Sequence, residues 1–155
     1  MTELRIELYK SDYLRDFVRL NSEWIQTFFH LESSDLDAFS DPEKYILKQG
    51  GQIFFAVNEL GRPVGCCALI NHPDEKCFEF AKMAVSPNHQ GRGVGRLLGE
   101  AVLAYARGQG IERIFLEGNT RLEASLALYR KLGFKKAAMR ENTHQRCDII
   151  MELDL

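Results

Sequence analysis

The segment that decides the fold reads Lys82-Met83-Ala84-Val85-Ser86-Pro87-Asn88-His89-Gln90-Gly91-Arg92-Gly93-Val94-Gly95-Arg96. Its first residues form an apolar run typical of a strand, and Pro87 marks a turn after that run. Three alternating glycines then open a segment whose apolar residues recur at the spacing of one helix face: Val94, Leu97, Leu98, Ala101, Val102 and Tyr105. The segment therefore predicts a strand, a glycine-rich turn and a helix in direct succession.

Such a turn can bind an anion. The first turn of a helix leaves backbone N–H groups without partners, and the helix dipole adds about half a positive charge at the same end. Arg92 and Arg96 add full charges that can pair with phosphate oxygens. We therefore expect a ligand that carries a pyrophosphate. The alternative is a glycine-rich turn that only caps the helix.

Two familiar phosphate-binding loops do not fit this segment. The Walker loop needs Gly, four residues and then Gly-Lys-Ser/Thr, a run that the chain lacks. The dinucleotide fingerprint needs a glycine where the chain has Arg96.

The composition of the 155 residues indicates one globular domain, residues 1–155, with 45% hydrophobic and 27% charged residues. No run approaches the ~18 apolar residues of a membrane span, and the N-terminus lacks the apolar region of a signal peptide. We therefore expect a cytoplasmic protein without a membrane partner. The net charge of −2 provides no global basic field and argues against nucleic acid as a partner.

The four cysteines fall inside apolar stretches that we interpret as strands: Cys66, Cys67, Cys77 and Cys147. They show no Cys-x-x-Cys spacing and no nearby pair of histidines. We interpret them as small core residues in a reducing compartment, and we expect neither a disulfide framework nor a metal site.

Periodicity and turn residues predict the order of the elements. Strands are expected at 5–9, 53–57, 64–70, 77–85, 111–116, 134–138 and 147–153, and helices at about 12–26, 41–50, 94–108 and 122–132. Asp41 as N-cap and Pro42 at the first helical position indicate the short second helix. Residues 27–39 before it have weak periodicity and are interpreted as a lid.

The predicted sheet is mixed. The strands before the glycine-rich turn are joined by turn-forming residues and predict an antiparallel meander. Strand 77–85, helix 94–108 and strand 111–116 form a crossover, which requires parallel pairing of the two strands. The chain is therefore expected to be an α/β protein.

Two motifs resemble those of the GNAT superfamily of N-acetyltransferases. Gln90-Gly91-Arg92-Gly93-Val94-Gly95 matches the signature Gln/Arg-x-x-Gly-x-Gly/Ala, and Leu128-Tyr129-Arg130-Lys131-Leu132-Gly133-Phe134 is similar to Leu-Tyr-x-Lys-x-Gly-Phe. The element order resembles the fold of that family over the whole chain, a central, mostly antiparallel seven-stranded sheet flanked by four helices. The resemblance implies acetyl-CoA as cofactor.

The implied activity is direct transfer of the acetyl group, in a ternary complex, to a primary amine of a small molecule or peptide. A non-catalytic acyl-CoA-binding sensor is the alternative, and a longer acyl donor stays open. A homodimer is compatible with the sequence.

The resemblance also implies roles for individual residues. Gln90 to Arg96 would hold the pyrophosphate, and Met83, Ala84 and Val85 would pair with the pantetheine arm through their main chain, with the Met83 N–H also available to a developing negative charge. Glu79 matches the glutamate that removes the amine proton, directly or through water, and a solvent-facing carboxylate is the alternative. Tyr129 matches the tyrosine that returns a proton to the departing thiolate.

The chain departs from the family pattern near that tyrosine. Leu122 stands where an asparagine is common, so Asn119 is expected to take over a contact with pantetheine. Ser125 replaces a common alanine; its hydroxyl would face the cofactor or bond back to its own helix, and we favour the bond to the helix.

Local charge is the best guide to the acceptor. Acidic residues gather near Phe28 and Phe29, at Glu32, Asp35, Asp37, Asp41 and Glu43, which favours a cationic acceptor with an apolar body. Arg140 and Arg146 would hold a carboxylate across the cleft, and His144 lies in the same polar stretch. A solvated acidic surface and an ordinary hairpin loop are the alternatives. If Glu79 is not the base, a water chain or Glu32 is the next candidate.

Overall fold

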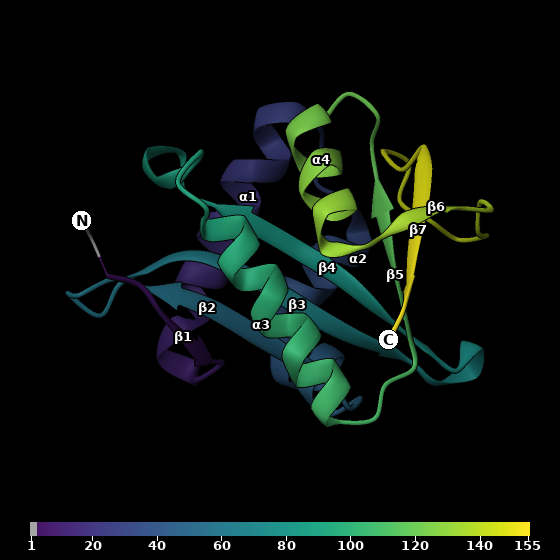
Figure 1. Ribbon diagram of the computed structural model, residues 1–155. Helices are drawn as coiled ribbons and strands as arrows, with labels where there is room; N and C mark the ends of the chain where they lie inside the picture. The colour runs from purple at the N-terminus through teal and green to yellow at the C-terminus, as the bar shows by residue number, and fades with distance from the viewer. Residues whose placement is uncertain (1–2) are drawn as a thin grey trace.

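A seven-stranded sheet forms the centre of the protein, in the strand order β1-β2-β3-β4-β5-β7-β6 (Figure 1). The computed structural model describes residues 3–155. The strands are β1 (Arg5–Leu8), β2 (Gln52–Val57), β3 (Pro63–His72), β4 (Cys77–Val85), β5 (Arg113–Gly118), β6 (Lys135–Ala137) and β7 (Ile149–Asp154). Within the described residues every neighbouring pair is antiparallel except β4 and β5, so the predicted mixed sheet with its parallel crossover is confirmed.

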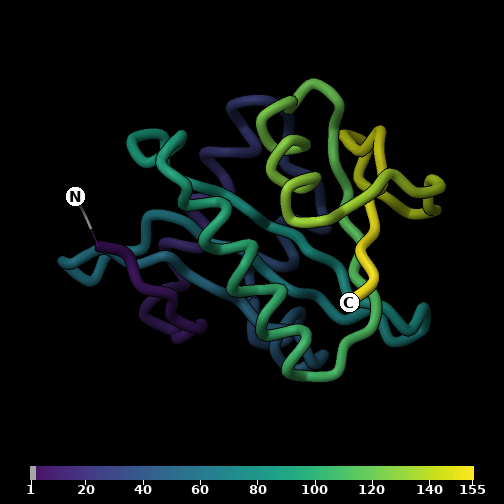
Figure 2. The backbone as a smooth tube through the Cα atoms, viewed as in Figure 1, coloured from purple at the N-terminus to yellow at the C-terminus, as the bar shows by residue number. Residues whose placement is uncertain are grey.

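Two pairs of helices cover the two faces of the sheet (Figure 2). α1 (Leu14–Phe28) and α2 (Ser33–Ser40) pack on one face, where the ring of Phe17 meets those of Phe39 and Phe55 edge to face. α3 (Val94–Gly108) and α4 (Glu123–Leu132) pack on the other face. Each face therefore has its own hydrophobic core, with the sheet between them.

The predicted second helix at 41–50 is wrong. The helix is α2, which lies in the segment interpreted as a lid, and the predicted range holds only a π-helical turn at Glu43–Leu47. Asp41 does accept a hydrogen bond from the Lys44 N–H at 3.1 Å, as expected of a cap. The turn after it is π-helical, because the Lys48 N–H donates to the carbonyl of Glu43, five residues earlier. The start of α2 depends on a capping box, in which the side chains of Glu32 and Asp35 each accept a hydrogen bond from the backbone N–H of the other residue.

Strands β4 and β5 separate along their length. Their pairing is limited to the partners Phe78–Ile114 and Glu79–Phe115. On its other edge, β4 carries a β-bulge, because residues 82 and 83 together face the single β3 residue Cys67. Figure 1 shows β4 and β5 diverging toward the end that carries α4. Residues 80–85 therefore have a free edge on the β5 side.

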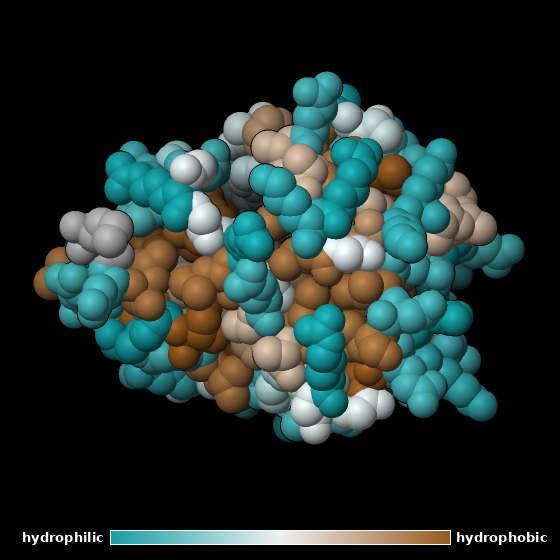
Figure 3. Space-filling model, viewed as in Figure 1, coloured by the Kyte–Doolittle hydropathy of each residue, from teal (hydrophilic) through white to brown (hydrophobic). Residues whose placement is uncertain are grey.

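No helix among residues 3–155 is long and apolar enough to cross a bilayer. Figure 3 shows hydrophobic side chains gathered beside α3 on the face in view. The large exposed hydrophobic residues of the described chain include Leu8, Leu60 and Leu97.

Candidate active site

The glycine-rich turn forms the predicted anion cradle at the start of α3. The first helical hydrogen bond runs from the Leu97 N–H to the Gly93 carbonyl at 3.0 Å, so the N–H groups of residues 94–96 precede it. Gly91 and Gly93 have φ values of 75° and 81°, which disfavour any residue with a side chain. The side chain of Val94 is buried in the core and fixes the turn to the sheet.

Gly95 has a different reason to be glycine. A Cβ atom there would lie 3.0 Å from Cδ2 of Leu128, and one at Gly99 would lie 2.5 Å from Cδ1 of Leu132. These two glycines let α3 approach α4. Position 95 therefore requires glycine at least as much because α3 packs against α4 as because a phosphate must approach the backbone.

Two side chains of the predicted cradle have protein partners. Gln90 donates from Nε2 to the Val85 carbonyl at 3.1 Å, which closes the turn. Arg96 pairs with Glu100 at 2.8 Å, and both side chains are more than half exposed. Such an exposed pair contributes little, so Arg96 is free to exchange this partner for a phosphate.

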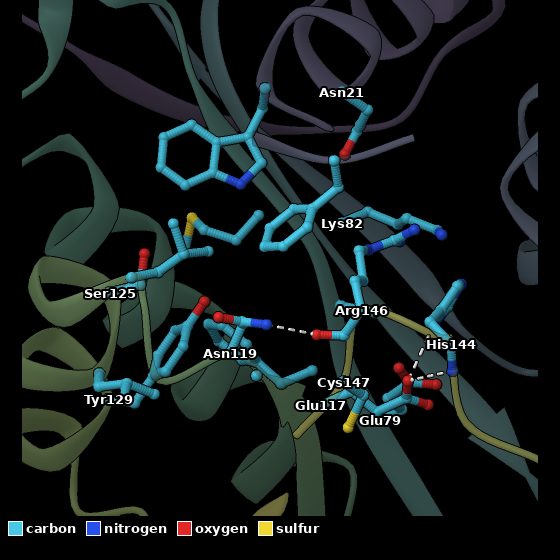
Figure 4. A pocket seen from close by; sticks show the side chains of 18 residues that line it. Asn21, Glu79, Lys82, Glu117, Asn119, Ser125, Tyr129, His144, Arg146 and Cys147 are labelled. Atoms are coloured by element: carbon cyan, nitrogen blue, oxygen red, sulfur yellow. Dashed lines mark hydrogen bonds and ion pairs between the residues drawn. The ribbon is translucent and has the colours of Figure 1, made fainter. Parts of the chain in front are cut away.

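A pocket of about 110 Å³ occupies the opening between β4 and β5. It is lined from α1, β4, β5, α4 and the segment between β6 and β7, and so reaches through the sheet from one helical layer to the other. Figure 4 shows Tyr129 and Ser125 on one side, Glu79, Glu117 and His144 on the opposite side, and Asn119 between them. The pocket thus separates a phenol from two carboxylates.

Glu79 faces the pocket and is 8% exposed, which contradicts the solvent-facing alternative. Its Oε1 lies 2.9 Å from Nε2 of His72, and the centre of the His72 ring lies 5.3 Å from that of Phe115, with the two ring planes tilted by 54°. Glu117, which the sequence analysis missed, lines the same pocket; its Oε1 accepts hydrogen bonds from the backbone N–H and Nδ1 of His144, both at 2.9 Å. Burial raises the pKa of Glu117, but the contacts with His144 lower it overall.

Tyr129 and Ser125 lie together on α4 at the other side of the pocket. Burial raises the pKa of Tyr129, and the Ser125 hydroxyl beside the phenol opposes this in part. Among residues 3–155 the Ser125 hydroxyl donates no hydrogen bond to a backbone carbonyl of α4, so the preference for a bond to the helix backbone is not supported. A raised pKa keeps the phenol protonated at neutral pH.

Asn119 lines the pocket, but its amide already has partners. Nδ2 donates to the Arg146 carbonyl at 2.7 Å, and Oδ1 accepts from the Arg121 N–H at 2.8 Å. Asn119 therefore fixes the end of β5 to the segment before β7, whatever else it contacts.

A buried ionic network borders the pocket. Asp35 of α2 is fully buried and accepts hydrogen bonds from Lys82 at 2.6 Å and from both Nη atoms of Arg146 at 2.9 Å, with His144 Nε2 at 3.3 Å. Burial raises the pKa of Asp35, but these cationic partners hold it well below its usual range. Hydrogen bonds to Asp35 and then Glu117 raise the pKa of His144 to about 9. At neutral pH the histidine is therefore a cation.

Lys82 in this network has a strained backbone. Its φ is 55°, in the left-handed region, which costs a residue with a side chain about 1 to 2 kcal/mol. Its side chain is 7% exposed, with Nζ 5.6 Å from the centre of the Phe39 ring. Nothing in the sequence pattern marks residue 82, because left-handed conformation is signalled only by Gly, Asn or Asp.

The predicted acceptor residues do not all lie together. Phe29, His144 and Arg146 line the pocket, whereas Phe28 and Arg140 do not. Arg140 pairs with Glu75 and its guanidinium lies 3.7 Å from the centre of the Phe115 ring, so the predicted pair of arginines is not formed. Glu32 does not line the pocket either, and it pairs with Arg146 at 3.0 Å. Charged partners within the protein, Lys82 and Arg146, thus neutralise part of the acidic segment.

The cysteines give no nucleophile. Cys66, Cys67 and Cys77 are buried, and burial raises the pKa of each, to about 12 for Cys66. Cys147 differs from the prediction, because it is only half-buried, precedes β7 and lines the pocket. Burial raises its pKa as well, so its thiol stays protonated at neutral pH.

Sequence reasoning also missed pocket residues on α1. Asn21 and Trp24 line the pocket, and Asn21 donates to the Phe17 carbonyl at 2.9 Å. Both residues lie on the buried face of α1, and the helical spacing of that face does not distinguish residues that line the pocket from residues of the core.

Comparison with known proteins agrees with this geometry. The sequence model of the "Acetyltransferase (GNAT) family" matches residues 13–134. The chain is 33% identical over 114 residues to an N-acetylaspartate synthetase of Xenopus tropicalis; the match covers 73% of the chain but only 42% of that relative.

Solved structures of acetyltransferases share the fold. An acetyltransferase of the GNAT family from Staphylococcus aureus superposes with a TM-score of 0.88 at 18% identity, covering 98% of this chain and 99% of that one. A phosphinothricin acetyltransferase from Sinorhizobium meliloti, solved in complex with AcCoA, has a TM-score of 0.80 at 18% identity and covers 98% of this chain and 88% of its own.

Proposed function

Because the chain belongs to the acetyltransferase (GNAT) family, we propose that it transfers the acetyl group of acetyl-CoA to a primary amine of a small molecule or peptide. The observation that carries the proposal is the continuity of β4. Its residues 79–83 line the pocket, and its end leads through the glycine-rich turn into the anion cradle of α3. A ligand with a pyrophosphate at one end and a reactive group at the other fits this arrangement.

The described residues fit acetyl-CoA. The N–H groups of residues 94–96 and the guanidinium of Arg92 would hold the pyrophosphate, together with the main chain of Gln90 to Gly93. The free edge of β4 at Met83, Ala84 and Val85 would pair with the pantetheine arm. Bound acetyl-CoA would supply a thioester carbonyl for attack and a thiolate as leaving group.

The acceptor amine must lose a proton. An amine with pKa ~10.4 is neutral about once in 2,500 molecules at pH 7, which corresponds to about 4.6 kcal/mol. Glu79, buried at the pocket wall, is the proposed base, acting directly or through water. Glu117 is the second carboxylate within the pocket, but its contacts with the protonated His144 lower its pKa and make it a weaker proton acceptor. We therefore rank Glu79 first.

On the opposite side, Tyr129 is the proposed acid. Its phenol is protonated at neutral pH and lies across the pocket from both carboxylates. Base and acid are therefore separated, so one can take a proton from the amine while the other gives one to the thiolate. The Met83 N–H on the free edge of β4 is the proposed donor to the developing negative charge.

The pocket revises the expected acceptor. Lys82 pairs with Asp35, and Arg146 pairs with both Asp35 and Glu32, so neither is available to hold a carboxylate of the acceptor. Trp24 and Phe29 provide apolar surface, and Glu79 and Glu117 can attract an ammonium group. We therefore propose a primary amine on an apolar body. A cytoplasmic location and a homodimer stay predictions.

Release of the coenzyme A thiol across a panel of amines tests this proposal. The panel pairs apolar monoamines with analogues that carry a carboxylate. We expect release with apolar monoamines, and no gain in kcat/KM from the carboxylate. Binding of acetyl-CoA without release across the whole panel would contradict the proposal and favour an acyl-CoA sensor.

A further inference from the structure

Asp35 joins the segments that surround the pocket without lining it. Its fully buried carboxylate contacts Lys82 on β4 and, between β6 and β7, His144 and Arg146. These three residues line the pocket, whereas Asp35 does not. Asp35 is thus the shared partner of cations from two sides of the pocket, and the proposed chemistry leaves it without a role.

The contact with Lys82 lies at the β4 bulge. Residues 82 and 83 together face Cys67 of β3, and Lys82 has the left-handed φ of 55°. The bulge follows the last residue of β4 that pairs with β5, Glu79, and it contains Met83, the first of the proposed main-chain contacts with the cofactor. The conformation of residue 82 therefore sets the direction in which β4 presents Met83 to the pocket.

We propose that Asp35 is a positioning residue, which holds Lys82 in its left-handed conformation and thereby fixes the β4 bulge at the pocket. A lysine rarely adopts this conformation unless its surroundings determine it. Its ammonium group is 2.6 Å from Oδ1 of Asp35 and has almost no access to solvent. The ion pair thus compensates the strain at the backbone. The proposal rests on the proposed function for its effect on turnover.

Two substitutions at position 82 test the proposal as a matched pair. Lys82→Gly and Lys82→Ala both remove the ammonium group, but only glycine adopts a positive φ at no cost. We expect kcat to be about tenfold higher in the glycine variant than in the alanine variant, with the same KM for acetyl-CoA in both. We also expect Asp35→Asn to lower kcat at least tenfold, and Lys82→Gly added to Asp35→Asn to recover part of the loss.

A readout that needs no turnover separates this proposal from the proposed function. Amide hydrogen exchange of residues 80–84 in the ligand-free protein should be faster in Lys82→Ala and Asp35→Asn than in Lys82→Gly. Should Asp35→Asn fail to fold, the pair at position 82 still tests whether the left-handed conformation of residue 82 fixes the bulge, which the positioning role requires. Equal exchange in the glycine and alanine variants would overturn the positioning role. Absence of acetyl transfer in the unaltered protein would refute the proposed function, and the exchange data would still decide the role of Asp35.

Discussion

His72 and Glu79 contact each other across the β3–β4 ladder, with Nε2 of the histidine 2.9 Å from Oε1 of the carboxylate. The Glu79 side chain is 10% exposed, whereas that of His72 is 35% exposed. One end of the pair therefore lines the pocket and the other reaches solvent. A proton that Glu79 takes from an amine would have a path out of the pocket through the imidazole.

The first prediction concerns the base. Glu79→Gln keeps the shape of the side chain and removes the carboxylate, so kcat at pH 7 should fall on the order of 10²-fold. The loss should shrink as pH rises, because more of the amine is then already neutral. Steady-state rates from pH 7 to 10 measure both effects. Glu117→Gln is the control within the same pocket; a larger loss in that variant than in Glu79→Gln would transfer the role to Glu117.

The second prediction concerns the acid. Tyr129→Phe removes one hydroxyl from a partly buried ring and should lower kcat by about 10²-fold. No recovery is expected as pH rises, because the missing step is donation of a proton to a thiolate. Steady-state rates of the variant and the unaltered protein from pH 7 to 10 provide the check. Full activity in Tyr129→Phe would mean that the thiolate leaves without help, and would leave the assignment of Glu79 intact.

The third prediction concerns the cradle. Gly93→Val should abolish binding of acetyl-CoA, because a branched side chain is strained at φ 81° and would stand before the N–H groups of α3. Gly61→Val is the matched control, since Gly61 has φ 76° and, like Gly93, open space around a Cβ, but lies in the β2–β3 turn. Isothermal titration calorimetry of both variants should show loss of affinity only in Gly93→Val. Equal affinities would remove the proposed phosphate site.

The fourth prediction follows from the raised pKa of His144. The folded-state pKa of about 9 exceeds the ordinary value of 6.5, so protonation of His144 stabilises the fold. The contribution is fully present below pH 6.5 and is lost as pH rises through about 9. The difference in Tm between the unaltered protein and His144→Gln should therefore narrow from pH 6.5 to 9.5. A constant difference over this range would show that the histidine is neutral in the folded protein.

The sequence predicted most of the fold because its elements carry local signals. The strand–glycine–helix segment at 82–96 and the crossover after it need no distant contacts to be identified. α2 was misplaced because its apolar residues are few and its start depends on a capping box between Glu32 and Asp35. Asp41 and Pro42 do begin a capped turn, but this turn ends at Leu47 and does not continue as an α-helix.

The site was less predictable than the fold. The cradle and Glu79 follow from one continuous segment, but the ionic network joins Asp35, Lys82 and Arg146, which are far apart in the chain. Pairing of this kind depends on tertiary packing and leaves no periodic pattern. For the same reason, the sequence does not show that Glu32 and Asp35 of the acidic cluster pair with Lys82 and Arg146.

The central claim is that the pocket between β4 and β5 transfers an acetyl group from acetyl-CoA to an amine. The most direct test incubates the protein with acetyl-CoA and an apolar primary amine, and measures both the released thiol and the acetylated amine by mass spectrometry. We predict one acetylated amine for each thiol released, and no acetylated protein when the amine is left out. Thiol release without an acetylated amine, or an acetylated cysteine that forms in the absence of amine, would contradict the account.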